Sequence, residues 1–130
     1  MVWGMLLPNG LLSYRLMIGK QNAQKYISIL QSSVIPIMKI NFKEAFIFQQ
    51  DNCPIHVAAK TKTFLQNQDI DVMEWPAYSP DINIIENVWA ILSNYVYADG
   101  KIENLSVLKS RISLAFKRFN EENIETVNKL

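Results

Sequence analysis

Apolar residues at the start of the chain fall into two short runs, and later ones recur at helical spacing. Residues 2–7 and 11–18 are typical of strands, and residues 8–10 (PNG) between them are typical of a tight turn. The chain is therefore expected to open with a hairpin. After Asn22, a suitable N-cap, apolar residues follow at helical spacing, and Pro36 should kink or end that helix.

Two further strands and a short helix are predicted in the middle of the chain. Within residues 45–50, the apolar run 46–48 ends in a polar cluster that leads to Asp51, as expected of a buried strand that delivers an acid to the edge of a sheet. Residues 58–68 have the pattern of an amphipathic helix, with Ala59, Thr63 and Phe64 expected on one side. Residues 71–75 are typical of a second strand, parallel to the first and ended by Pro76.

The strongest helical stripe of the chain comprises Ile85, Val88, Trp89, Leu92 and Val96. Because Trp89 falls on this stripe, we expect it in the core rather than on a surface that stacks on bases. A last helix is predicted over residues 105–119, and residues 120–130 are expected to form a frayed tail. The order strand, strand, helix, strand, helix, strand, helix, helix predicts an α/β domain with a mixed sheet flanked by helices.

Composition narrows the class of protein. Residues 1–130, of which 49% are apolar, suffice for one domain with its own core. The net charge of +1 lacks the basic excess of a free-standing nucleic-acid binder. The single cysteine excludes an internal disulfide and suits a reducing compartment, so nucleus or cytosol is expected. No apolar run approaches the roughly 18 residues of a membrane span, so no membrane partner is expected.

Asp51 and Glu86 are the candidate catalytic residues and metal ligands. Asp51 follows its strand at the edge where α/β sheets place ligand sites, and Glu86, after 34 intervening residues, opens a helix expected to return over that edge. Together they would hold a hard divalent cation through oxygen ligands. Plainer readings remain open: an Asp after a strand often satisfies backbone donors in a turn, and a Glu in a first helical turn favours the helix dipole.

Two longer motifs carry a resemblance to a known family. They are residues 48–56 (FQQDNCPIH) and residues 75–89 (WPAYSPDINIIENVW), with further similarity at residues 2–4 and 22–27. These segments resemble the catalytic domain of mariner-superfamily DNA transposases. The resemblance covers essentially the whole chain and implies a ribonuclease H-like fold.

The same resemblance implies a reaction and its partners. The family carries an Asp–Asp–Glu or Asp–Asp–Asp triad that binds Mg²⁺ or Mn²⁺, cuts the transposon ends from DNA and joins them to a target. By this resemblance Asp51 matches the second acid of the triad and Glu86 the third. The implied partners are DNA and either a second copy of the chain, as a homodimer, or full-length transposase. The implied location is nuclear.

Five residues are assigned to structural support of the site: Asn52, His56, Ser79, Asp81 and Asn83. Asp81 belongs to the second motif but not to the triad, and with Ser79 or Asn83 it is expected to cap the helix of Glu86. His56, the single histidine, is expected to fix the loop after Asp51. Contact with a phosphate, or proton transfer, is its alternative role. Cys53 is assigned to packing only.

The first acid of the family's triad has no counterpart in this sequence. In the family it lies on a strand before the hairpin, and the one acid that precedes Asp51 here is Glu44, at the opposite end of the same strand. We therefore expect a truncated catalytic domain that lacks the first, central strand and the DNA-binding region, and that is inactive alone. The alternative function is a transposon-derived binding or regulatory module that associates with full-length transposase. A generic α/β domain that matches by chance is a third, remote alternative.

Overall fold

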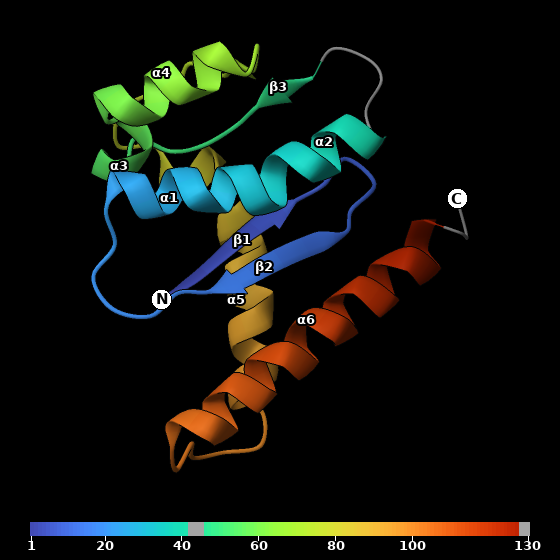
Figure 1. The fold of residues 1–130 in the computed structure, drawn as a ribbon. Helices are drawn as coiled ribbons and strands as arrows, with labels where there is room; N and C mark the ends of the chain where they lie inside the picture. The colour runs from blue at the N-terminus through green and yellow to red at the C-terminus, as the bar shows by residue number, and fades with distance from the viewer. Residues whose placement is uncertain (42–45, 128–130) are drawn as a thin grey trace. The chain divides into compact units, whose positions relative to one another are not determined.

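The chain folds into two compact units, drawn together in Figure 1. This computed structural model describes the backbone of residues 1–41 and 46–127. We call Met17–Pro80, together with Met1, the Asp51 unit, and Val2–Leu16 with Asp81–Leu130 the Glu86 unit. Strands and helices follow one another in the predicted order, which confirms the α/β class. The single domain and the absence of a central strand stay predictions.

The Glu86 unit begins with the predicted hairpin. Strands β1 (Val2–Leu6) and β2 (Leu12–Leu16) pair in antiparallel fashion and form a two-stranded sheet. In the turn, the Gly10 N–H donates to the Leu7 carbonyl oxygen at 2.8 Å, and Gly10 has a φ of 81°. Glycine suits this position because its missing Cβ removes the penalty of a left-handed backbone.

Two helices complete the Glu86 unit, α5 (Ile84–Tyr97) and α6 (Leu105–Val127). They pack against each other, and α6 also contacts β2 (Figure 1). The predicted stripe forms the core that joins these elements, and Trp89 packs against it as expected. The buried members of this core are Leu12, Val88, Leu92, Val96, Ala115, Phe116 and Phe119.

Helix α6 does not end near residue 119, and that predicted boundary is wrong. The Asn120 side chain accepts a hydrogen bond from the Leu12 N–H at 2.7 Å and donates one to the Leu12 carbonyl oxygen at 3.0 Å. One amide therefore satisfies both backbone groups of a strand residue, and the helix continues to Val127. The fraying expected of residues 120–130 stays a prediction.

Close packing explains why glycine occupies the middle of β1. A Cβ placed on Gly4 would lie 2.6 Å from the Trp89 Cη2 atom and 3.0 Å from its Cζ2 atom. Trp89 in turn meets the Phe116 ring edge to face, with the ring centroids 6.1 Å apart. Gly4 therefore lets the indole of α5 lie directly on the hairpin backbone.

The Asp51 unit opens with a long helical rod that does not stop at Pro36. Helix α1 (Ala23–Ile29) passes through a π-helical turn, Leu30–Val34, into α2 (Ile35–Asn41). Proline cannot donate a backbone hydrogen bond, and a wider turn directly before it accommodates that loss. The prediction that Pro36 ends the helix is therefore wrong, since helical structure continues through the π turn (Figure 1), and a kink at this point stays a prediction.

The start of this rod agrees with the sequence. The Asn22 side chain accepts a hydrogen bond from the Lys25 N–H at 2.9 Å, which confirms it as the N-cap of α1. In the rod, Tyr26, Ile27, Leu30 and Val34 are buried. The predicted apolar face of this helix is therefore confirmed.

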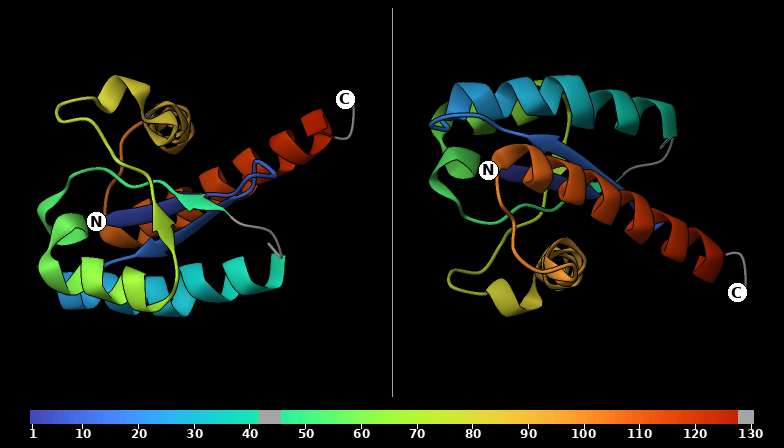
Figure 2. Two further views of the ribbon diagram at one scale, coloured as in Figure 1. Left: turned by 90° about the horizontal axis from the view of Figure 1, so that it is seen from above. Right: turned by 90° about the horizontal axis from the view of Figure 1, so that it is seen from below.

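The two strands of the Asp51 unit are short and parallel, as predicted. Strands β3 (Ile47–Phe48) and β4 (Asp71–Val72) pair in register Ile47 with Asp71, and they lie side by side in Figure 2, left. The Met73 N–H continues the ladder by donating to the Phe48 carbonyl oxygen at 2.9 Å. The expected strand over residues 45–50 is thus reduced among described residues to two paired positions, directly before the polar cluster.

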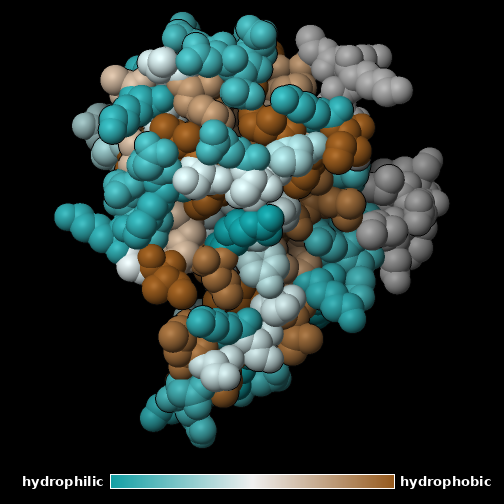
Figure 3. All heavy atoms as spheres, in the orientation of Figure 1, coloured by the Kyte–Doolittle hydropathy of each residue, from teal (hydrophilic) through white to brown (hydrophobic). Residues whose placement is uncertain are grey.

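Between these strands, the helix predicted at residues 58–68 is present, and a further single turn precedes it. Helix α3 (Pro54–Val57) is a single turn, and α4 (Ala59–Asn67) follows after a break at Ala58, whose ψ is 144°. Thr61 and Leu65, one turn apart, are buried, and the outer face of α4 is hydrophilic (upper part of Figure 3). The segment is amphipathic as expected, but its buried face is not the one expected, because Ala59 and Thr63 are exposed and Phe64 is only half-buried. Helix α3 is an added turn next to Asp51.

Candidate functional site

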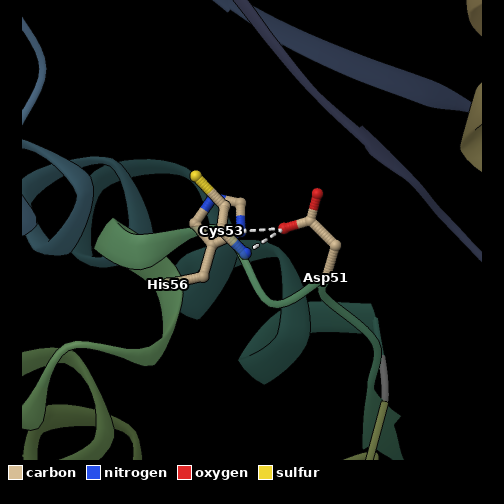
Figure 4. Close-up of side chains that lie close together, drawn as sticks. All are labelled: Asp51, Cys53 and His56. Atoms are coloured by element: carbon tan, nitrogen blue, oxygen red, sulfur yellow. Dashed lines mark hydrogen bonds and ion pairs between the residues drawn. The ribbon is translucent and has the colours of Figure 1, made fainter. Parts of the chain in front are cut away.

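Asp51 follows β3 after a short loop, and its carboxylate is held by two neighbours. Its Oδ1 atom accepts a hydrogen bond from the Cys53 N–H at 3.0 Å and lies 2.6 Å from His56 Nδ1 (Figure 4). Among the described residues, no hydrogen bond to the second oxygen, Oδ2, is found, and the side chain is 45% exposed. One oxygen of Asp51 is therefore fixed in place while the other remains open to a ligand.

His56 is itself held from two sides. Its ring lies against that of Tyr26, with the centroids 4.3 Å apart, and its backbone carbonyl accepts a hydrogen bond from Gln50 Nε2 at 3.2 Å. The Tyr26 hydroxyl donates to Gln50 Oε1 at 2.7 Å. Helix α1 thereby contacts the loop after Asp51, which His56 was expected to fix, and His56 lies against the Asp51 carboxylate.

Asn52 connects the same loop to the chain that follows β4. Its side-chain Nδ2 donates to the Trp75 carbonyl oxygen at 3.0 Å. Trp75 opens the second sequence motif, so the two motifs meet through this contact in the Asp51 unit. Support of a metal site by Asn52 and His56 stays a prediction, and these contacts give it a structural basis.

Glu86 lies in the first turn of α5 and is exposed to solvent. Its backbone N–H donates to the Asn83 carbonyl oxygen at 2.9 Å. No side-chain hydrogen bond or ion pair of Glu86 is found in the part of the chain that the structure describes. Glu86 therefore presents an exposed carboxylate at the N-terminal end of α5, where the helix dipole is positive.

The cap of α5 differs from the expectation. Asn83 occupies the N-cap position and is buried, but its side chain makes no capping hydrogen bond. Ser79 donates its hydroxyl to the Ala77 carbonyl oxygen at 3.1 Å, and Asp81 lies in a short 3₁₀ turn, Pro80–Ile82. The expected side-chain cap is therefore not found at Asn83, and capping of α5 by Asp81 stays a prediction.

The two candidate ligands belong to different units, Asp51 to one and Glu86 to the other. Their convergence on one cation therefore stays a prediction. Glu44, which the sequence placed at the far end of the Asp51 strand, lies outside the described residues.

Cys53 is the residue whose surroundings the sequence did not reveal. One donor atom each from Asp51, Cys53 and His56 lies within 4.8 Å of the others, and all three residues are half-buried. The spacing Asp-x-Cys-x-x-His, with a cysteine and a histidine three residues apart, was the signal available in the sequence.

Comparison with known proteins identifies the class. A family model described as DDE superfamily endonuclease matches residues 2–109, and the chain belongs to this family. The Tc3 transposase of Caenorhabditis elegans is 33% identical over 128 residues, which make up 98% of this chain and 39% of that protein. The chain therefore spans about two fifths of the length of this curated relative.

Solved structures extend the similarity to the fold. The catalytic domain of Mos1 mariner transposase matches with a TM-score of 0.68 at 18% identity, covering 99% of this chain and 75% of that one. A structure of that domain and raltegravir with Mg matches with a TM-score of 0.64 at 17% identity, covering 99% and 76%. The ribonuclease H-like fold expected from the sequence is thereby confirmed. No helix among the described residues has the length and apolar character of a membrane span.

Proposed function

We propose that this chain supplies two of the metal-binding carboxylates of a cut-and-paste DNA transposase, Asp51 and Glu86, with Mg²⁺ or Mn²⁺ as the ion. The observation that carries the proposal is the state of Asp51, whose Oδ1 is fixed by two neighbours while Oδ2 is open. Membership of the DDE endonuclease family supports the assignment. Hard oxygen donors of this kind are the ligands that Mg²⁺ prefers.

In the proposed reaction, the metal ion activates the nucleophile, and the side chains bind and orient the ion. A bound divalent ion would activate a water or a 3′-hydroxyl and neutralise charge on a phosphodiester. Asp51 and Glu86 would hold that ion through carboxylate oxygens. His56 and the Cys53 N–H would keep the Asp51 carboxylate in one orientation, so that less conformational freedom is lost when a ligand binds.

The proposed substrate is DNA, at the transposon ends and at the target, and the proposed location is the nucleus. We also propose that the chain acts with a second copy of itself or with full-length transposase. These assignments are supported by the relative described as a transposable-element transposase.

We propose further that the chain alone has little or no cleavage activity, because Glu44 is the one acid before Asp51. Purified chain would be incubated with plasmid DNA and Mg²⁺ or Mn²⁺. No cutting above the background of the Asp51→Ala variant is expected. Robust cutting that disappears in Asp51→Ala would contradict the proposed inactivity and show that two acids suffice.

Metal binding can be tested without DNA. Titration with Mn²⁺, followed by electron paramagnetic resonance of the free ion, would compare the unmodified chain with Asp51→Asn and Glu86→Gln. Each variant should bind Mn²⁺ at least about tenfold more weakly. Asp71→Asn, which changes an exposed acid of β4, is the matched control and should bind as the unmodified chain does. An unchanged affinity in Glu86→Gln would overturn the shared site and leave Asp51 alone as the ligand.

A second candidate is a regulatory module that associates with full-length transposase. The observation in its favour is exposed apolar surface at the β3–β4 pair, where Ile47, Val72 and Met73 are 64%, 38% and 41% exposed. Co-purification with full-length transposase in the presence of a chelator would support this function. Association that requires Asp51 and a divalent ion would speak against it.

A further inference from the structure

Asp51, Cys53 and His56 bring together three different donor types on six consecutive residues. One carboxylate oxygen, the Cys53 sulfur and one His56 ring nitrogen all lie within 4.8 Å of one another (Figure 4). Thiolate and imidazole are ligands for zinc and similar transition metals, whereas Mg²⁺ selects oxygen. This donor set therefore differs in kind from a site made of carboxylates.

We propose that Asp51, Cys53 and His56 form a binding site for a transition metal ion of the zinc class. Three protein ligands leave the fourth tetrahedral position to water, as in open zinc sites. On binding, the Cys53 thiol loses its proton to solvent and the thiolate sulfur bonds to the ion, so that the site carries two anionic ligands and one neutral ligand.

Local structure already places the ligands on one turn. The N–H groups of His56 and Val57 donate to the Cys53 carbonyl oxygen at 2.8 Å and 3.1 Å, which closes α3 and keeps residues 53 and 56 on one side of it. The ring of Tyr26 lies against the His56 ring, and the side-chain amide of Gln50 donates a hydrogen bond to the His56 backbone carbonyl oxygen. Supporting contacts of this kind fix the orientation of a ligand before the ion arrives.

The rearrangement needed is small. Bonds of about 2.0 Å from zinc to nitrogen and oxygen, at a tetrahedral angle, separate the two ligand atoms by about 3.3 Å. The present separation between His56 Nδ1 and Asp51 Oδ1 is 2.6 Å, so this pair has to open by less than one ångström. The Cys53 sulfur, which lies within 4.8 Å of the other two donor atoms, also has to approach the ion to a bond length of about 2.3 Å.

Because Asp51 serves both sites, a zinc-class ion would compete with Mg²⁺ or Mn²⁺ for its carboxylate. This consequence rests on the proposed function. The new site itself does not, since it needs neither Glu86 nor DNA. Its failure and the failure of the proposed function are therefore distinguishable by Glu86→Gln, which should weaken Mn²⁺ binding and leave the zinc-class site intact.

The experiment uses Co²⁺ as a spectroscopic probe for the purified full chain. The sequence holds one cysteine and one histidine, so a thiolate-to-cobalt absorption band reports Cys53 alone. We expect one Co²⁺ per chain, a thiolate band, and visible absorption typical of a tetrahedral site. One equivalent of Zn²⁺ should remove both signals.

Variants then assign the ligands. Cys53→Ser should lose the thiolate band, and Cys53→Ser and His56→Gln should each bind Zn²⁺ at least about 100-fold more weakly. Asp71→Asn and Glu86→Gln should keep the band. The thiolate band is measured on the unmodified chain. The proposal can therefore still be tested if the His56→Gln variant fails to fold.

Two results would overturn the site. One is a cobalt complex without a thiolate band, and the other is Zn²⁺ affinity that survives both Cys53→Ser and His56→Gln. In either case the contact between His56 and Asp51 is a hydrogen bond that orients the carboxylate and nothing more.

Discussion

The loop that carries Asp51 is held by polar contacts, whereas the helix that carries Glu86 is held by an apolar core. Asp51 is fixed by the Cys53 N–H and by His56, and the loop is tied to Trp75 through Asn52. Helix α5 is instead fixed by the buried cluster that it shares with β2 and α6. The same type of side chain is thus positioned in two physically different ways.

This difference decides what a substitution should do. In the Asp51 unit, changing one polar partner alters the orientation of the acid and removes few other contacts. In the Glu86 unit, the acid makes no side-chain hydrogen bond or ion pair among the residues that the structure describes, and the position of its helix depends on the apolar core. Core changes should therefore cost more stability than changes at either acid.

The largest effect is expected from Gly4→Ala, which tests the apolar support of α5. The new methyl group would meet the Trp89 indole at 2.6 Å, and overpacking of this kind costs about 1–3 kcal/mol of unfolding free energy. Urea denaturation would measure the loss.

A double-mutant cycle with Trp89→Phe gives the matched control. Because the smaller ring removes the atoms that clash, Gly4→Ala should cost less in the Trp89→Phe background than alone. Equal costs in both backgrounds would show that strain in β1, rather than the indole, causes the loss.

The next effect is expected from Asn120→Ala, which removes the clamp between α6 and β2. Loss of two hydrogen bonds that leave the Leu12 backbone groups unsatisfied should lower the unfolding free energy by about 1–3 kcal/mol. Asn123→Ala, which removes a single bond to the Gly10 carbonyl oxygen, is the control and should cost less. Similar losses in the two variants would contradict the clamp.

A smaller effect is expected when the two acids are compared directly. Asp51→Ala removes both contacts of Oδ1 and should cost about 1 kcal/mol, since the side chain is 45% exposed and solvent weakens the interaction. Glu86→Ala should stay within about 0.5 kcal/mol of the unmodified chain. Denaturation in metal-free buffer would measure both, and a larger loss in Glu86→Ala would reverse the comparison.

The smallest effect concerns the surface of α5 and α6. Hydrogen bonds from the Tyr95 hydroxyl and from Arg118 hold the pKa of Glu122 below its usual range. A lowered folded-state pKa adds stability above the unfolded-state pKa, and this stability is lost as the pH falls through the folded-state value. Glu122→Gln should therefore destabilise the protein slightly at neutral pH and not in acid.

Urea midpoints over a pH series would measure the difference between the Glu122→Gln variant and the unmodified chain. Glu121→Gln is the control, because its Lys117 partner lies at 3.8 Å and both side chains are exposed. A difference that grew toward acid pH would be opposite to the expected sign.

Much of the fold follows from local pattern. The hairpin, the N-cap at Asn22 and the stripe on α5 are each specified by residues close together in the sequence. The π turn before Pro36 was not predicted, because proline by itself indicates a kink or an end of a helix. In the structure the turn before the proline widens, and the helix continues past it. Asn120 was placed in a polar tail, because its partner Leu12 lies 108 residues away.

The sequence by itself determined the identity of the candidate acids and the family to which the chain belongs. Both follow from the two motifs that contain Asp51 and Glu86, and neither requires the distance between these residues in space. Only the tertiary structure decided that Cys53 and His56 share the neighbourhood of Asp51, and that Gly4 makes room for Trp89. Both depend on where side chains point after folding, and spacing along a chain does not fix that direction.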